Sequence, residues 1–164
     1  MNLYLIVRFL HIASAILLVG GVGARRLVRS VANRSGDPRK LAAIFAAADP
    51  IERTMVIPGS FLVILFGVIL ALMTGAPIFG FLQGATQNWL LLANSLILLT
   101  VALVPLVFIP RGKAFGRHLQ TAIEEQRITP ELRASLDDPV VGFAHWMEIC
   151  VLALVVVLMV FKPL

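Results

Sequence analysis

The sequence predicts an all-α membrane protein: a bundle of four transmembrane helices with both termini outside the membrane. Hydrophobic residues make up 59% of the 164 residues and charged residues only 14%, whereas about a quarter of a soluble domain is charged. Four apolar runs reach the roughly 20 residues that a helix needs to cross a bilayer. Arginine and lysine gather in two of the three connecting loops, and loops of this kind stay on the cytoplasmic side.

We expect one domain, residues 1–164, with spanning helices at about 3–24, 50–74, 89–109 and 139–162. The cytoplasmic loops are then 25–49 and 110–138, and the uncharged stretch 75–88 lies outside. The net charge of +5 comes from residues that flank apolar runs, where it attracts anionic lipid headgroups. The expected partner is therefore the lipid bilayer, and nucleic acid is not expected.

Helix starts are marked on the cytoplasmic side by an aspartate or threonine followed by proline, which suits an N-cap and the first helical position. Such pairs stand at 37–38, 49–50, 129–130 and 138–139. We expect short interfacial helices near 38–48 and 130–136. Asp49, with Glu52 three residues further on, is expected to start the second spanning helix as a capping box. The stretch after residue 110 can continue the third helix.

Small residues indicate where the first two spans meet. Gly20, Gly21 and Gly23 lie near the inner end of the first span, and Gly59 with Ser60 lies at a similar depth in the second. Such residues let helix backbones approach closely in a membrane.

Ionisable groups at membrane depth are costly and usually meet a partner. Arg8 and His11 are three residues apart and share one face of the first helix, while Lys162 ends the fourth helix at the same outer surface. A histidine beneath cations suits haem b, whose iron takes an imidazole and whose propionates pair with arginine or lysine. His11 is therefore the candidate iron ligand, with Arg8 and Lys162 as propionate partners. The alternative is a hydrogen-bonded histidine and two cations that extend to lipid headgroups.

His145 and Glu148 form a second polar cluster in the inner half of the fourth helix, within the depth that Arg25, Arg26 or Arg53 can reach. One interpretation is an ion pair with a hydrogen-bonded histidine, and the other is proton transfer or a second metal or haem site.

The two histidines of these clusters lie in opposite halves of the membrane, so one haem is not held by both. A second axial ligand for His11 would be Met73 or Met159, or the iron is five-coordinate. His118 lies among loop residues and is expected in solvent. Cys150 is the single cysteine, so neither a disulfide nor a cysteine-rich metal site is expected.

Three segments, "HIASAILLVGG", "IPGSFLVILFGVILALMTG" and "LVVVLMVFKP", resemble a family of small predicted bacterial integral membrane proteins of unknown function. More distantly, the chain is similar to HemJ-type protoporphyrinogen oxidases and CopD-like membrane domains. This resemblance implies a haem bound through His11 with Lys162 as a companion. The chain departs from the HemJ pattern, because Leu18 and Val19 replace aromatic residues and "ARRLVRSV" replaces a proline and aromatics. These departures affect the specific oxidase reaction more than the haem site.

The functional expectation is a multi-pass protein of the bacterial plasma membrane that binds haem b and acts in electron transfer or porphyrin oxidation; whether it is an enzyme stays open. The alternative is a non-catalytic membrane subunit or assembly factor that docks a membrane-protein partner or a second copy of itself. The sequence shows no nucleophile–base pair, carboxylate dyad or nucleotide-binding loop that would indicate another enzyme class.

Overall fold

The computed structural model describes residues 2–162, and within that range it is all helical with no strand. The first long helix is α1 (Leu3–Ala32). The second consists of α2 (Pro38–Ile51), the π-helical segment η1 (Glu52–Val56) and α3 (Ile57–Thr74). The third consists of α4 (Trp89–Leu103), the π-helical segment η3 (Val104–Phe108) and α5 (Ile109–Glu124). The fourth unit contains α6 (Pro130–Leu136) and α7 (Pro139–Phe161), and a 3₁₀ turn, η2 (Gly80–Gln83), lies in the loop between α3 and α4.

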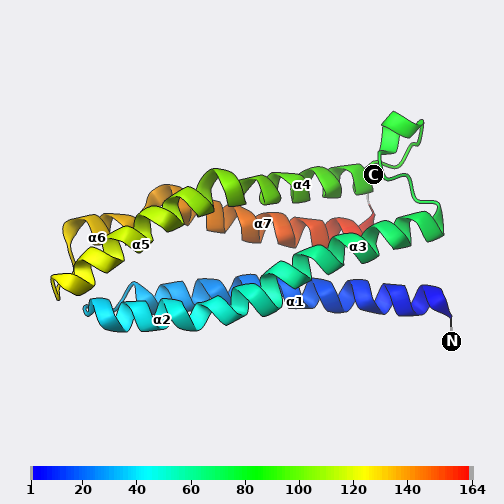
Figure 1. Ribbon diagram of the computed structural model, residues 1–164. Helices are drawn as coiled ribbons and strands as arrows, with labels where there is room; N and C mark the ends of the chain where they lie inside the picture. The colour runs from blue at the N-terminus through cyan, green and yellow to red at the C-terminus, as the bar shows by residue number, and fades with distance from the viewer. Residues whose placement is uncertain (1, 163–164) are drawn as a thin grey trace.

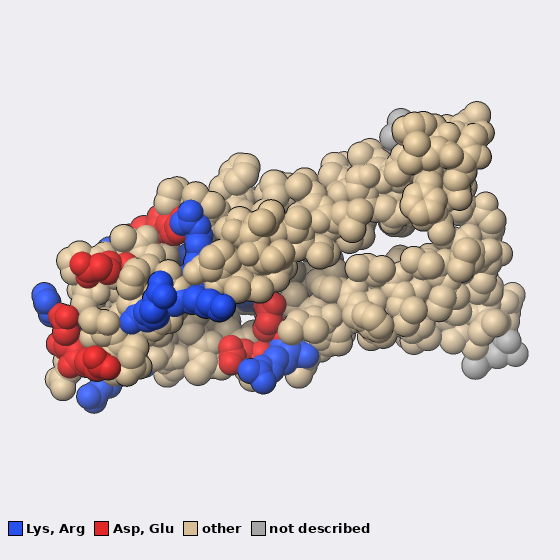
Figure 2. Space-filling view, turned by 45° about the horizontal axis from the view of Figure 1, so that its top comes forward, with Lys and Arg blue, Asp and Glu red and all other residues tan. Residues whose placement is uncertain are grey.

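Four helical stretches of the described chain are long and apolar enough to cross a membrane, which confirms the expected fold class. Figure 1 shows that α1 begins and α7 ends at the same end of the molecule, as four passes require. On the face shown in Figure 2, lysine, arginine, aspartate and glutamate gather over the opposite end. The positive-inside rule predicts that this end faces the cytoplasm and that the termini lie outside; it is called the cytoplasmic end.

The helices extend well beyond the expected spans, so the two cytoplasmic loops are largely helical. Residues 25–32 belong to α1, residues 38–49 belong to α2, and residues 110–124 belong to α5. The reason is that these segments are rich in alanine, arginine, lysine, glutamine and glutamate, which are strong helix formers even without an apolar environment.

The prediction that Asp49 starts the second spanning helix is wrong. Pro50 lies inside α2, which begins at Pro38 and continues without a break into η1 and α3. The other three starts are confirmed: the side chains of Asp37, Thr129 and Asp138 each accept a hydrogen bond from a backbone N–H in the first turn. A proline after an aspartate therefore marks a start only where the preceding chain leaves the helix.

Two Ile–Pro pairs explain the π-helical segments. The backbone N–H of Ile57 donates to the carbonyl of Glu52, and that of Ile109 donates to the carbonyl of Val104. Each isoleucine immediately precedes a proline, Pro58 or Pro110. A proline inside a helix lacks a donor and its ring collides with the carbonyl four residues earlier, so widening the preceding turn keeps the helix continuous.

The bundle is built from two helix pairs, visible in Figure 1: α1 packs along η1 and α3, and α4 packs along α7. Close contact between the first two spans is confirmed at Gly21 and Gly59, but not at Gly23, where an added Cβ would meet nothing within 4 Å. A Cβ added at Gly21 would lie 2.9 Å from Met55 Cβ and Val56 Cγ2, and one at Gly59 would lie 2.9 Å from the backbone N of Leu18. Backbone approach this close is possible only for glycine.

At the cytoplasmic end the two pairs are joined by a small apolar core of the kind found in soluble proteins. Its buried members come from α1, α2, α5 and α6: Ala32, Leu41, Ala122, Leu132 and Leu136. This core fixes the cytoplasmic extensions of the helices and forms one wall of the cavity described below.

Candidate functional site

All four long helices contribute to one polar cluster near the cytoplasmic end of the spanning region. Arg25 of α1 donates from Nη2 to Glu148 Oε2 at 2.5 Å and from Nη1 to Glu52 Oε2 at 3.1 Å. His145 Nδ1 lies 3.5 Å from Glu148 Oε2, and the His145 ring stacks on Phe108 with centroids 4.7 Å apart. We call Arg25, Glu52, Phe108, His145 and Glu148 the inner polar cluster.

The structure shows which of the three arginines predicted within reach of His145 and Glu148 pairs with Glu148. Arg25 makes the ion pair. Arg26, its neighbour, instead lies over the ring of Trp146, 3.8 Å from the centroid, and Arg53 pairs at 3.9 Å with Asp49 on the surface. Depth along a helix is readable from sequence, whereas the direction in which each side chain leaves the helix follows from packing.

The inner polar cluster is partly shielded from solvent. Glu148 is 7% exposed, while the side chain of Glu52 is 39% exposed. Arg25 Nε is buried with no hydrogen-bond partner, and the guanidinium lies 5.4 Å from the centroid of Phe108. A buried carboxylate is tolerated when a charged, hydrogen-bonded partner compensates it. Arg25 is that partner, and the cluster therefore fixes the relative positions of four helices.

Sequence reasoning missed Glu52 and Phe108 as members of this cluster. Both lie in π-helical segments, Glu52 in η1 and Phe108 in η3. The signal that could have found them is the repeated Ile–Pro pair, because a widened turn changes which residues face the bundle and such turns are frequent at functional sites.

In the outer half of the bundle, His11 of α1 packs directly on α3. Its Nδ1 lies 2.9 Å from the backbone carbonyl of Val63. A Cβ added at Gly67 would lie 3.1 Å from His11 Cε1, so the missing side chain of Gly67 makes room for the ring. Because a carbonyl only accepts hydrogen bonds, Nδ1 carries a proton, and in the neutral form of the ring Nε2 keeps a free lone pair.

Arg8, His11 and Lys162, which the sequence groups at the outer surface, are called the outer cluster. Its two cations lie on different helix pairs. Arg8 is exposed on α1, one turn from His11. Lys162 follows α7, with Nζ 5.3 Å from the ring centroid of Trp89 at the start of α4. Among residues 2–162, no hydrogen bond or ion pair joins Lys162 to Arg8 or His11. The two candidate second ligands also differ, because Met73 is exposed and Met159 packs against buried residues of α4 and α7.

The hydrogen bond of His11 has a form that is common around metal-binding histidines. A metal-binding histidine usually donates its other ring N–H to a carbonyl or carboxylate, which fixes the tautomer and the ring orientation. Val63 supplies that acceptor here. Of the two outer cations, Arg8 is exposed on the same helix as His11, whereas Lys162 lies on the second helix pair. Within residues 2–162 no group of three His, Cys, Asp or Glu side chains could hold a metal ion by itself.

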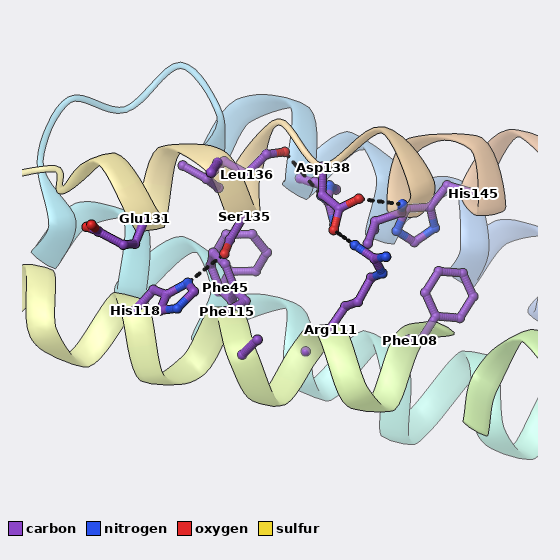
Figure 3. Close-up of a pocket in the computed structure, with 15 residues that line it drawn as sticks. Phe45, Phe108, Arg111, Phe115, His118, Glu131, Ser135, Leu136, Asp138 and His145 are labelled. Atoms are coloured by element: carbon purple, nitrogen blue, oxygen red, sulfur yellow. Dashed lines mark hydrogen bonds and ion pairs between the residues drawn. The ribbon is translucent and has the colours of Figure 1, made fainter. Parts of the chain in front are cut away.

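A cavity of about 590 Å³ lies at the cytoplasmic end, between α5, α6 and α7. Figure 3 shows Arg111 facing Asp138 in the middle of this cavity, with His118 and Ser135 towards one end. His118 was expected in solvent; it is half-buried instead, and its Nδ1 lies 2.7 Å from Ser135 Oγ. The sequence did not predict this cavity.

Asp138 combines a helix cap with an ion pair. Burial by itself raises the pKa of Asp138. The hydrogen bond from Arg111, the backbone N–H groups of Val140 and Val141 and the charge of Arg111 outweigh burial and hold the pKa below its ordinary value. The carboxylate therefore stays ionised at neutral pH.

Four apolar helical stretches, charges gathered at one end and a polar cluster held inside the bundle define a polytopic integral membrane protein. The chain belongs to the family described as "Predicted integral membrane protein (DUF2269)", whose family model matches residues 5–163. No curated protein and no solved structure matches the chain. The resemblance to HemJ-type oxidases and CopD-like domains gains no support from these comparisons.

Proposed function

We propose that this protein binds haem b in the outer half of the bundle, with His11 Nε2 as the axial ligand, and that it acts in electron transfer in the bacterial plasma membrane. One observation carries the proposal: the hydrogen bond between His11 Nδ1 and the Val63 carbonyl, which leaves Nε2 free. Oxidation of a porphyrin is the narrower form of the same proposal.

Each residue of the outer cluster has a defined task in this proposal. The Val63 carbonyl holds the proton on Nδ1 and orients the ring, while Gly67 leaves space for it. Arg8 would pair with a propionate, and Lys162 would pair with one from the second helix pair. The bound haem supplies a one-electron Fe²⁺/Fe³⁺ couple whose potential depends on its axial ligands and surroundings.

The arrangement of the helix pairs supports this location. In Figure 2 an opening separates the two pairs in the half of the molecule that shows no charges, and the strongest packing lies within each pair rather than between them. A macrocycle between the pairs would be screened from water.

Haem titration of the purified protein tests the proposal. In detergent, the wild-type protein should take up haemin and give a Soret band, and His11→Ala should abolish it. Gly67→Ala should weaken binding, because the new Cβ lies 3.1 Å from the His11 ring. Gly23→Ala is the matched control, since an added Cβ there meets nothing within 4 Å. A protein that stays colourless after haem addition, or a spectrum unchanged by His11→Ala, would contradict the proposal.

A second candidate function is a non-catalytic membrane subunit or assembly factor. It is favoured by the same weak packing between helix pairs, which leaves apolar faces that a larger membrane-protein partner can cover. Purification in a gentle detergent tests it. A large co-purifying partner would support this candidate, and an isolated monomer or dimer would count against it.

A further inference from the structure

Arg29 is a half-buried cation without a carboxylate partner. It lies in the last turns of α1, and its Nη2 donates to the backbone carbonyl of Leu136 at 3.2 Å. Among residues 2–162 no aspartate or glutamate forms an ion pair with it, whereas Arg25 and Arg111 both have such partners. Removing a charge from water without a counterion is costly, and a guanidinium has five N–H donors, of which this carbonyl uses one.

Arg29 lines the cavity between α5, α6 and α7. The cavity measures about 590 Å³, and Arg29 also lines a smaller one of about 250 Å³ beside it. The larger volume lies in the range of small-molecule sites. Its walls include Phe45, Phe108 and Phe115, and the rings of Phe45 and Phe115 are in contact, with centroids 4.7 Å apart.

The acidic groups of the cavity are already compensated or solvated. Asp138 pairs with Arg111 and accepts hydrogen bonds from two backbone N–H groups. Glu131 is exposed on α6. Of the two histidines, His118 contacts the Ser135 hydroxyl and His145 lies beside Glu148. Asp138 also attracts Arg29 electrostatically, but its direct ion pair is with Arg111, so Arg29 keeps N–H donors that a ligand anion can pair with directly.

We propose that this cavity binds an amphipathic organic anion. Its carboxylate or phosphate pairs with Arg29, and its apolar body lies among Phe45, Phe108 and Phe115. A guanidinium recognises both anions through paired N–H donors. The ligand reaches the site from one of two sources, a soluble cytoplasmic anion or the headgroup of an anionic lipid in the inner leaflet. The site is separate from the outer haem site and does not depend on it.

Fluorine NMR with the full-length protein in phosphatidylcholine nanodiscs tests this site. The probe is 4-(trifluoromethyl)benzoate, and 4-(trifluoromethyl)benzylamine is the matched cation; empty nanodiscs give the background. Saturable binding of the benzoate and none of the amine is expected. Arg29→Gln should weaken benzoate binding about tenfold or more, the size expected for a charged hydrogen bond. Arg133→Gln is the control, because Arg133 is exposed on α6 and does not line the cavity.

A second variant keeps the test decisive if Arg29→Gln does not fold. Gly112 lines the cavity, and a Cβ added there meets nothing within 4 Å. Gly112→Leu adds an apolar side chain at the wall of the cavity, favours the helix and leaves Arg29 intact. It should reduce benzoate binding as well.

The lipid content of the nanodiscs identifies the source of the anion. If phosphatidylglycerol in the nanodiscs competes with the benzoate, the natural occupant is a lipid headgroup; if benzoate affinity is unchanged, it is a soluble anion. The proposal is overturned if the benzoate shows no saturable binding, if the amine binds equally well, or if a folded Arg29→Gln or Gly112→Leu protein binds the benzoate as wild type does.

Discussion

The ion pair between Arg25 and Glu148 should act as a single unit in holding the four helices together. Arg25 Nη2 lies 2.5 Å from Glu148 Oε2, and the two side chains are 20% and 9% exposed. Removing one partner of a buried pair costs about 3–5 kcal/mol because the other charge is left uncompensated. Glu52 remains 3.1 Å from Arg25, so Glu148→Gln should cost less, about 2 kcal/mol. Arg25→Gln leaves Glu148 beside only His145 and should cost about 3 kcal/mol.

The double variant is the informative one. With both charges removed, no unpaired ion is buried, so Arg25→Gln with Glu148→Gln should cost no more than the worse single variant. The coupling energy is then about 2 kcal/mol, within the range measured for residues in contact. The assay is reversible unfolding in mixed micelles, with increasing SDS and helix content followed by circular dichroism.

The surface pair between Arg53 and Asp49 provides the control. Its atoms are 3.9 Å apart and its side chains are 78% and 73% exposed, so Arg53→Gln should cost well under about 1 kcal/mol. If the costs of Arg25→Gln and Glu148→Gln simply add in the double variant, the two residues are energetically independent and the argument for the inner polar cluster is refuted.

Two further predictions concern packing and pH. Gly59→Ala should destabilise the protein by about 1–3 kcal/mol, because the new Cβ meets the backbone of Leu18 at 2.9 Å; an effect as small as that of Gly23→Ala in the same SDS titration would contradict it. Because the pKa of Asp138 is lowered in the folded state, its ionisation stabilises the protein above the unfolded pKa of about 3.9, and this contribution disappears as the pH falls through the lower folded value. Asp138→Asn should therefore be less stable than wild type at pH 7, and the difference should shrink below about pH 4; a pH-independent difference in melting temperature would show that the charge is not responsible.

The sequence was sufficient for the four spans, for three helix starts and for the contact between Gly21 and the second span. Each of these depends on local pattern: run length, a cap followed by proline, or small residues at matching depth. The helical content of the cytoplasmic loops was underestimated because apolar run length defines the span and not the helix. The start predicted at Asp49 is wrong because the preceding chain is already helical and continues past the cap signal.

For the candidate sites too, the sequence indicates how deep a side chain lies along its helix but not the direction in which it points. Depth along α1 and α7 brought His145 and Glu148 together with three arginines, but only packing selected Arg25. Depth also grouped Lys162 with His11, and the structure instead places Lys162 over Trp89 on the second helix pair. The contact of His11 with Val63 and the cavity beside Arg29 join residues far apart in the chain, so no local pattern could predict them.

The most direct test of the central claim is the haem content of the protein isolated from its own membranes. A pyridine haemochrome assay on wild-type and His11→Ala protein, purified side by side in the same detergent, measures it. Stoichiometric haem b is expected in the wild type and none in His11→Ala. A wild-type protein without haem, or a His11→Ala protein with undiminished haem, would contradict it.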